Sequence, residues 1–373
     1  MNRGVFLVVY TNGRAAGNSV VRGPWPARLK PLDDESLSSW LVRASLANRS
    51  TPSQIVNHVW PKWRAWTRDV DRGLDVSQTN ALTQISTLHP EVIKQMLLAP
   101  IVQKITGKDS LSNSIAWKWV VQRSTRSVNT NRSTQFCPEC LRTDHKPYLR
   151  LKWRLSFITI CTKHQVELLD CCPQCGESVE IHKLKRGKLK YCAHCRWDIS
   201  DTDTVNCNPG ILILTEQLIS ELRNKEKAES KFELLRFTIA LLRRLTDSKY
   251  AITDPLLLSL AAQTDECRLS DIRRLSFDWL NSDDRRNLLT MTAPLIELPP
   301  KELASVLLNS GIPIGRLRSF VPHLPKSLEQ HFPRRETKSC RLNKTSPKSS
   351  LKPTPKRLVQ RRWETFLKKH GLS

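Results

Sequence analysis

Apolar residues begin to recur at helical spacing after an irregular lead-in that is rich in glycine and proline. Within 37–47 they follow the i, i+3, i+4, i+7 pattern of a helix with one apolar face, and the acidic run at 33–35 suits the positive end of its dipole. A second helix is predicted directly afterwards, because Thr51 and Gln54 have the spacing of a capping box. Two helices joined by so short a turn indicate either a helical hairpin within a core or a helix-turn-helix that binds DNA.

Helical spacing returns on both sides of a polar middle region. Before that region it predicts helices at 80–88 and 91–98, the second of which ends before Pro100. After it, nothing in the pattern suggests a strand-rich domain. Five helices are predicted there, at 211–222, 231–245, 255–262, 269–280 and 301–308. Prolines then mark a tail, which ends in a predicted helix at 356–369.

Most of the cysteines gather in that middle region, where eight of the eleven fall between Cys137 and Cys195. Seven of these cysteines and His164 form four pairs in which two residues separate the members, and each pair can direct two side chains at one ion. Two pairs complete a tetrahedron of sulfur and nitrogen donors, which is the arrangement that zinc prefers. The pattern predicts two structural Zn²⁺ sites, with ligands Cys137, Cys140, Cys161 and His164 in the first and Cys172, Cys175, Cys192 and Cys195 in the second.

With four protein ligands on each ion, no position remains for an activated water, so a structural role is favoured over a catalytic one. A redox dithiol needs a single Cys-x-x-Cys motif, not four paired sets. Cys171 is an alternative to Cys172, but only Cys172 completes the Cys-Pro-x-Cys pattern. The remaining cysteines and nearby histidines are interpreted as ordinary thiols and surface imidazoles: Cys207, Cys267, Cys340, His145, His182 and His194.

The charge of the chain favours a polyanionic partner. The formal net charge is +25, from 60 Lys and Arg against 35 Asp and Glu. The stretch 333–373 has 13 Lys or Arg and two acids, and 182–196 has six basic residues and no acid. Nucleic acid is the usual partner of such a chain, although a basic charge also serves solubility or binding to an acidic protein.

Basic and aromatic residues alternate at 148–155, between the ligand pairs of the first predicted site. This pattern fits contact with a nucleic-acid backbone, or else packing of the aromatic residues around the metal with the basic residues solvated. Two further arginines follow a possible second helical corner at 301–320, which Pro313 interrupts. The candidate DNA-binding residues are Arg150, Lys152, Arg154, Lys183, Lys185, Arg186, Lys188, Arg316 and Arg318.

The fold class that follows is mainly α with small zinc-ribbon modules. The predicted segments are an irregular lead-in at 1–30, a helix-turn-helix-like domain at 31–110, a tandem zinc-finger domain at 111–208, a helical C-terminal domain at 209–332 and a basic flexible tail with a terminal helix at 333–373.

Several classes of protein are disfavoured. No apolar run reaches the roughly 18 residues that a membrane span needs, and no signal peptide is apparent, so a cytoplasmic location is predicted. The chain lacks the Gly-x-x-x-x-Gly-Lys-Ser/Thr loop of an ATPase. No set of carboxylates stands out as a two-metal site, which disfavours a nuclease or a transposase. We therefore expect a protein that is not an enzyme.

The N-terminal helical region and the cysteine-rich region of the sequence resemble the TniQ/TnsD-type transposition proteins. The resemblance covers roughly residues 29–200 and includes the opening at 31–41 and the stretch 168–176. Its most specific part lies between the first ligand pairs, because a bare zinc ribbon would share the cysteines but not the intervening Tyr148, Trp153 and arginines.

The resemblance implies a helix-turn-helix before the two zinc motifs and an adaptor role in DNA transposition. Such an adaptor links target DNA, or an RNA-guided CRISPR effector complex, to the AAA+ ATPase that recruits the transposase. Helical corners and eleven tryptophans leave room for a homodimer interface. The alternative function is a zinc-dependent, DNA-binding transcription regulator that works without transposition machinery.

Overall fold

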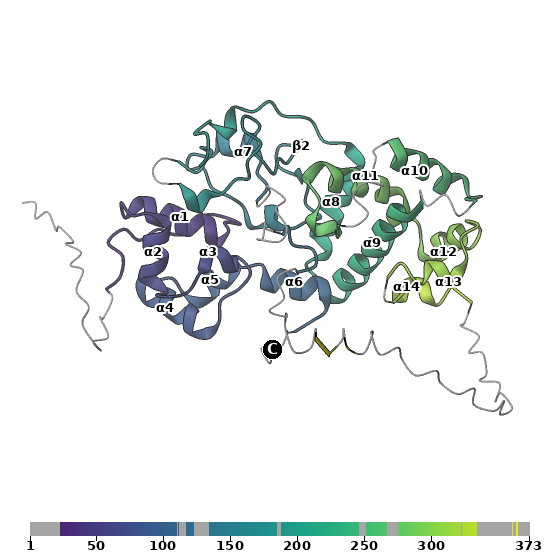
Figure 1. The fold of residues 1–373 in the computed structure, drawn as a ribbon, viewed down its shortest axis with the longest axis horizontal. Coiled ribbons are helices and arrows are strands. Elements are labelled where there is room, and N and C mark those ends of the chain that lie inside the picture. Colours follow the sequence, from purple (N-terminus) through teal and green to yellow (C-terminus); the bar gives the residue numbers. More distant parts are fainter. Residues whose placement is uncertain are drawn as a thin grey trace, which may run out of the picture. The chain divides into compact units, whose positions relative to one another are not determined.

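A computed structural model of the chain is mainly helical, as the sequence predicts (Figure 1). It describes residues 23–109, 111, 117–122, 134–184, 188–245, 251–266, 275–321, 323–333, 360 and 363–364. The chain forms two compact units, Met1–Phe332 and Pro333–Ser373. None of the helices in the described part combines the length and hydropathy that crossing a bilayer requires.

The first two helices begin where their capping residues predict. Helix α1, Leu37–Ala47, starts at Ser36, whose side chain accepts a hydrogen bond from the Ser39 amide. Helix α2, Pro52–Val59, has the full capping box of Thr51 and Gln54. Leu37, Trp40, Leu41 and Ala44 of the predicted apolar face are buried, but the polar residues among the first nine of the helix are buried as well, so this part of α1 has no solvated face.

The acidic run before α1 also differs from the prediction. The first turn of α1 contains no acidic residue, so the run does not act there on the helix dipole. Glu35 is buried instead, where it forms an ion pair with Arg43 and accepts a hydrogen bond from Ser39 Oγ. Its neighbour Asp34 has a left-handed backbone with φ of 54°. This carboxylate run therefore forms part of the internal structure.

Four more helices complete the N-terminal region: α3, Ala65–Arg68; α4, Val76–Ser86; α5, Pro90–Gln95; and α6, Ala99–Thr106. Pro100 lies in the first turn of α6, where its missing N–H breaks no helical hydrogen bond, so it starts a helix instead of following one. Apolar side chains of α1 to α5 form a core of their own, which includes Trp25, Trp40 and Trp60.

The middle region has little regular structure. Its described residues contain one short helix and three 3-10 turns: α7, Pro138–Thr143; η1, Leu151–Arg154; η2, Ile181–Lys183; and η3, Ile199–Asp201. Strands β1, Ile160–Cys161, and β2, Val166–Glu167, pair antiparallel, with Ile160 opposite Glu167 and Cys161 opposite Val166. They form the one sheet among the described residues.

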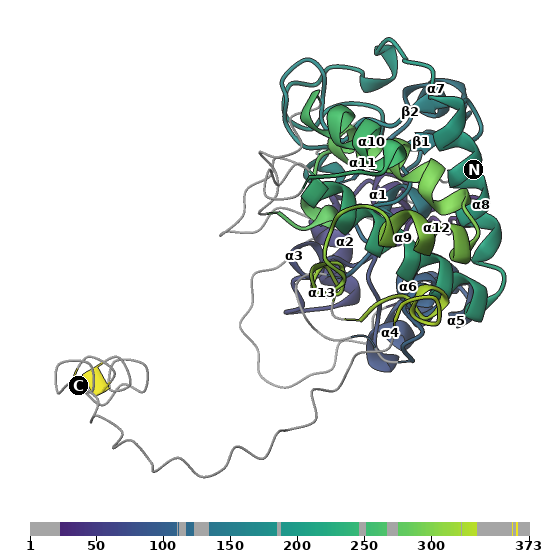
Figure 2. The ribbon, with the colours of Figure 1, turned by 90° about the vertical axis from the view of Figure 1, so that its right-hand side faces the viewer.

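Helices return after Asn208: α8, Pro209–Glu221; α9, Lys225–Leu245; α10, Pro255–Glu266; η4, Phe277–Trp279; α11, Ser282–Glu297; α12, Pro300–Leu308; α13, Ile314–Leu317; and α14, Lys326–Glu329. The long helix α9 packs against α6, α8, α10 and α11, and α8, α9 and α11 lie close together in Figures 1 and 2. The middle region and these helices share one continuous core, in which Trp119, Phe157 and Phe232 make edge-to-face contacts.

Two predicted elements in this part need correction. In the stretch predicted as a helix at 269–280, the described residues 275–280 form only the 3-10 turn η4. Helix α11, which contains Pro294, is an addition that the sequence analysis does not predict. Other predictions lie outside the described residues: the lead-in before residue 23, Lys185, Arg186, Cys267, Cys340 and most of the tail helix.

Candidate metal centres and the buried arginine network

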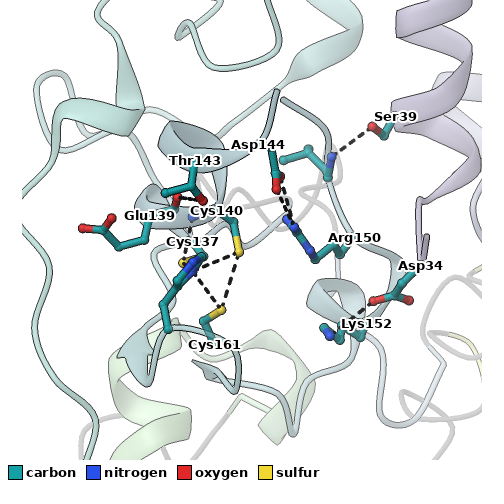
Figure 3. Close-up of polar contacts among 12 residues, drawn as sticks. Asp34, Ser39, Cys137, Glu139, Cys140, Thr143, Asp144, Arg150, Lys152 and Cys161 are labelled. Atoms are coloured by element: carbon teal, nitrogen blue, oxygen red, sulfur yellow. Dashed lines mark hydrogen bonds and ion pairs between the residues drawn. The ribbon is translucent and has the colours of Figure 1, made fainter. Parts of the chain in front are cut away.

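The first Cys/His cluster forms where α7 meets the β1–β2 turn (Figure 3). Cys137 caps α7, and its sulfur accepts a hydrogen bond from the Cys140 amide at 3.4 Å. The sulfur of Cys140 lies 3.6 Å from that of Cys161 and 3.3 Å from Nδ1 of His164. Two sulfurs on one tetrahedral zinc, each about 2.3 Å from the ion, would lie about 3.8 Å apart. The cluster therefore has dimensions that suit a single ion.

The second cluster has the same dimensions and a more regular backbone. Sulfur separations are 3.7 Å for Cys172 and Cys195, and 3.8 Å for Cys175 and Cys192. Within each cluster the four ligand atoms all lie within 4.8 Å of one another. This spacing brings together the eight residues that the sequence predicts as ligands, in the predicted two sets.

Two matching turns form the second cluster. The amide of Cys172 donates to the carbonyl of Glu177 and that of Cys192 to Trp197, both at 2.8 Å. The residue after each Cys-x-x-Cys motif has a left-handed backbone, with φ of 71° at Gly176 and 69° at Arg196. Glycine adopts this conformation without strain, whereas arginine rarely does, so the second turn depends more on its surroundings.

The electrostatics of the thiols favour a cation at both clusters. Hydrogen bonds from the thiols of Cys137 and Cys140 lower the pKa of Cys161 below its usual value. Burial raises the pKa of the Cys172 thiol to about 12. Several sulfurs this close can all be thiolates only when a cation compensates their charge. The described residues thus contain two donor sets that can hold a metal ion.

Other cysteines and histidines of the region lie outside both sets. Cys171 pairs through its backbone with Ser178, and the cluster contains Cys172. The ring of His182 stacks on Trp66, with ring centroids 5.3 Å apart. Cys207 is partly buried and belongs to neither cluster.

Arg150 lies beside the first cluster, where it pairs with Asp144 (Figure 3). Its Nη2 donates to both carboxylate oxygens of Asp144 at 3.0 Å. The guanidinium also lies over the rings of Tyr148 and Trp153, at 4.5 Å and 4.8 Å from their centroids. The residue is 7% exposed. Its planar face and its Nη2 group are therefore used within the protein.

Arg154 is fully buried and joins the middle region to the N-terminal helices. Its guanidinium forms ion pairs with Asp69 at 2.7 Å and with Asp71 at 2.9 Å, and its relative exposure is 0%. Asp71 also accepts hydrogen bonds from the Ser38 amide at 2.6 Å and the Ser38 hydroxyl at 2.7 Å. Both guanidinium groups, of Arg150 and Arg154, are buried and paired within the protein, which disfavours the predicted contact with DNA, and that contact stays a prediction.

The other candidate DNA-binding residues remain accessible where the structure describes them. Lys152 is about one-third exposed and pairs with Asp34 at 3.6 Å. Lys183, Lys188 and Arg316 are exposed, and Arg318 is half-buried. Contact between these residues and DNA stays a prediction.

The buried carboxylate of Asp278, which the sequence does not reveal, connects the middle region to the C-terminal helices. Asp278 accepts hydrogen bonds from the Trp119 amide at 2.9 Å and from the Ser156 hydroxyl at 2.6 Å. It also pairs with Arg236 of α9 at 3.1 Å. These contacts fix the segment 117–122 against α9.

The described residues thus define a mainly helical protein with two clusters of four Cys or His side chains, each of which could hold a metal ion. Residues 26–168 match the TniQ family, so this part of the chain is similar to a domain of adaptor proteins associated with DNA transposition. The matched part contains the N-terminal helices, the first cluster and the Arg154 network, while the second cluster and α8 to α14 lie beyond it. No curated protein matches the chain.

Proposed function

We propose that this chain is a non-enzymatic adaptor that selects targets for DNA transposition. It links target DNA, or an RNA-guided targeting complex, to an AAA+ ATPase that regulates the transposase. The observation that carries the proposal is the TniQ domain at residues 26–168. The strong positive charge of the chain supports contact with DNA as part of this role.

Both clusters are proposed to hold Zn²⁺ as a structural ion. Three sulfurs with one imidazole nitrogen, and four sulfurs, are the usual donor sets of structural zinc sites. Because protein atoms fill all four positions, the ions contribute folding energy and shape. Cys137, Cys140 and Cys161 then hold the segment 149–151 in place, and that segment exchanges backbone hydrogen bonds with Asp34 and Ser36.

Capture of the AAA+ ATPase encoded beside this chain is the expected result of a pull-down in zinc-replete buffer with ATP. An adaptor should also change how much of that ATPase loads onto DNA, measured by co-sedimentation with labelled duplex. An unrelated AAA+ ATPase serves as the control and should not be captured. Reproducible failure of both measurements, with folded and metal-loaded protein, would contradict the adaptor and favour a transcription regulator.

Removal of residues 334–373 is expected to weaken DNA binding without unfolding the rest of the chain. The deleted stretch has 13 Lys or Arg and two acids, and it lies within the separate unit Pro333–Ser373. Each phosphate contact that is lost should reduce the slope of log K against log salt by about 0.9 for duplex DNA. Filter binding between about 50 and 200 mM salt measures this slope, and thermal unfolding tests the fold. Unchanged affinity and slope would show that the tail does not contact DNA.

A further inference from the structure

Arginine side chains stack on buried aromatic rings along one side of α9. The guanidinium of Arg236 lies over Trp119 at 4.0 Å from the ring centroid, and that of Arg244 lies over Phe320 at 4.9 Å. Arg244 also donates to the Phe320 carbonyl at 3.0 Å. The rings themselves are 3% and 8% exposed. Stacking fixes the plane of each guanidinium. Arg244 is exposed, whereas Nε and Nη2 of Arg236 are buried, so Arg236 contributes its charge.

More cations surround these two arginines. Arg243 follows Arg236 by seven residues, so the two lie on one side of α9, about 10 Å apart along its axis. Lys118 is exposed next to the Trp119 backbone, and Arg316 is exposed on α13. We refer to Lys118, Arg236, Arg243, Arg244 and Arg316 as the α9 basic surface.

Like charges act on one another across this surface. Burial, and then the charge of Arg236, lowers the pKa of Lys118. Burial, and then the charges of Arg244 and Arg236, lowers the pKa of Arg243. The pKa of Arg244 is lowered by burial and by Arg316. The cations thus lie near enough to repel one another, and an anion placed among them would relieve that repulsion.

Carboxylates compensate this charge only in part. Asp278 pairs with Arg236, but it is buried and also accepts hydrogen bonds from Trp119 and Ser156. Glu233 acts on Lys118 more weakly than Arg236 does. The surface therefore keeps a net positive charge that is fixed in position by helix α9 and by the stacked rings.

We propose that the α9 basic surface binds the phosphodiester backbone of duplex DNA. The proposal rests on the DNA contact in the proposed function and gives that contact a location outside the matched TniQ domain, apart from Lys118. Binding of single strands depends on aromatic faces on which bases stack, whereas here arginines cover Trp119 and Phe320. The surface consequently offers charge and planar donors, which recognise phosphates and read no sequence.

The test is a triple substitution in the full-length chain, Lys118→Gln with Arg244→Gln and Arg316→Gln. Arg236 is left unchanged because it pairs with buried Asp278. Loss of three phosphate contacts should reduce the slope of log K against log salt by about three for a duplex of unrelated sequence. The matched control neutralises three exposed cations elsewhere, Arg223→Gln, Lys227→Gln and Lys301→Gln, and should change the slope much less.

An equal slope for the triple variant and the wild-type chain would overturn the proposal, as would an equal loss in the control. Loss of binding to single-stranded RNA, with duplex DNA unaffected, would assign the surface to RNA and also overturn it. If the triple variant binds DNA less well but still captures the AAA+ ATPase, the loss belongs to the α9 basic surface and not to a failure of the adaptor function. If the triple variant unfolds, the single substitution Arg316→Gln, at an exposed position, should still reduce the slope by about one.

Discussion

Replacement of Cys140 by serine is expected to remove the metal ion from the first cluster and to unfold the middle region. The sulfur of Cys140 is fully buried and lies within 3.6 Å of two other donor atoms of its set. A structural zinc site contributes on the order of 10 kcal/mol, because metal binding and folding occur together. This is comparable to the whole stability of a domain, which is about 5 to 15 kcal/mol. Elemental analysis and thermal unfolding would measure both losses.

The control for this experiment is Cys207→Ser. Cys207 is partly buried, as some of the ligands are, but it belongs to neither cluster. The Cys207→Ser protein should therefore retain two metal ions per chain and unfold near the wild-type temperature. A Cys140→Ser protein that kept both ions and its unfolding temperature would show that the first cluster does not bind metal through this sulfur.

Features that depend on neighbouring residues could be predicted from the sequence. The capping box of Thr51 and Gln54 lies within one turn of chain, and it starts α2 where expected. The same holds for the Cys-x-x-Cys motifs, since each tight turn aims two side chains at one point. Pairing the motifs in chain order then predicted both donor sets that the structure brings together.

Features that depend on distant packing were predicted less well. An apolar stripe at 37–47 indicates one buried face, yet α1 is buried on every side because later segments also cover its polar residues. Ser38 contacts Asp71, and Ser39 contacts Leu149. The effect of a proline depends on where in a helix it lies, and α5 ends before Pro100, as predicted. Pro100 starts α6, and Pro294 lies within α11.

The arginines between the ligand pairs show the limit of a local pattern. An Arg that alternates with aromatic residues looks the same in sequence whether it faces a nucleic acid or a buried carboxylate. The difference lies in the partners of Arg154, which are 83 and 85 residues away in the chain. Nothing in the local sequence of Asp69 and Asp71 marks them as those partners. Only the folded structure brings the three side chains together.

Substitution of Arg154 by methionine should cost about 3 to 5 kcal/mol of stability, because it removes one partner of a buried ion pair and leaves two carboxylates without it. Burial already raises the pKa of Asp71 above its ordinary value of 3.8, and the charge of Arg154 opposes that effect. Without the arginine, the carboxylate of Asp71 should bind a proton more tightly in the folded variant than in the unfolded chain. The loss of stability of the Arg154→Met protein relative to the wild-type chain should therefore be smallest in acid and should grow as the pH rises above about 4.

Chemical denaturation at several pH values would measure both effects, with Lys152→Met as the matched control. Lys152 is two residues away and pairs with Asp34, but its side chain is 34% exposed, so its loss should cost about 1 kcal/mol or less. Adding Asp69→Asn and Asp71→Asn to the Arg154→Met protein should restore part of its stability, since the buried charges are then gone. Equal stabilities of the Arg154→Met and Lys152→Met proteins would contradict the role of Arg154 as the buried link between the metal-binding region and the N-terminal helices.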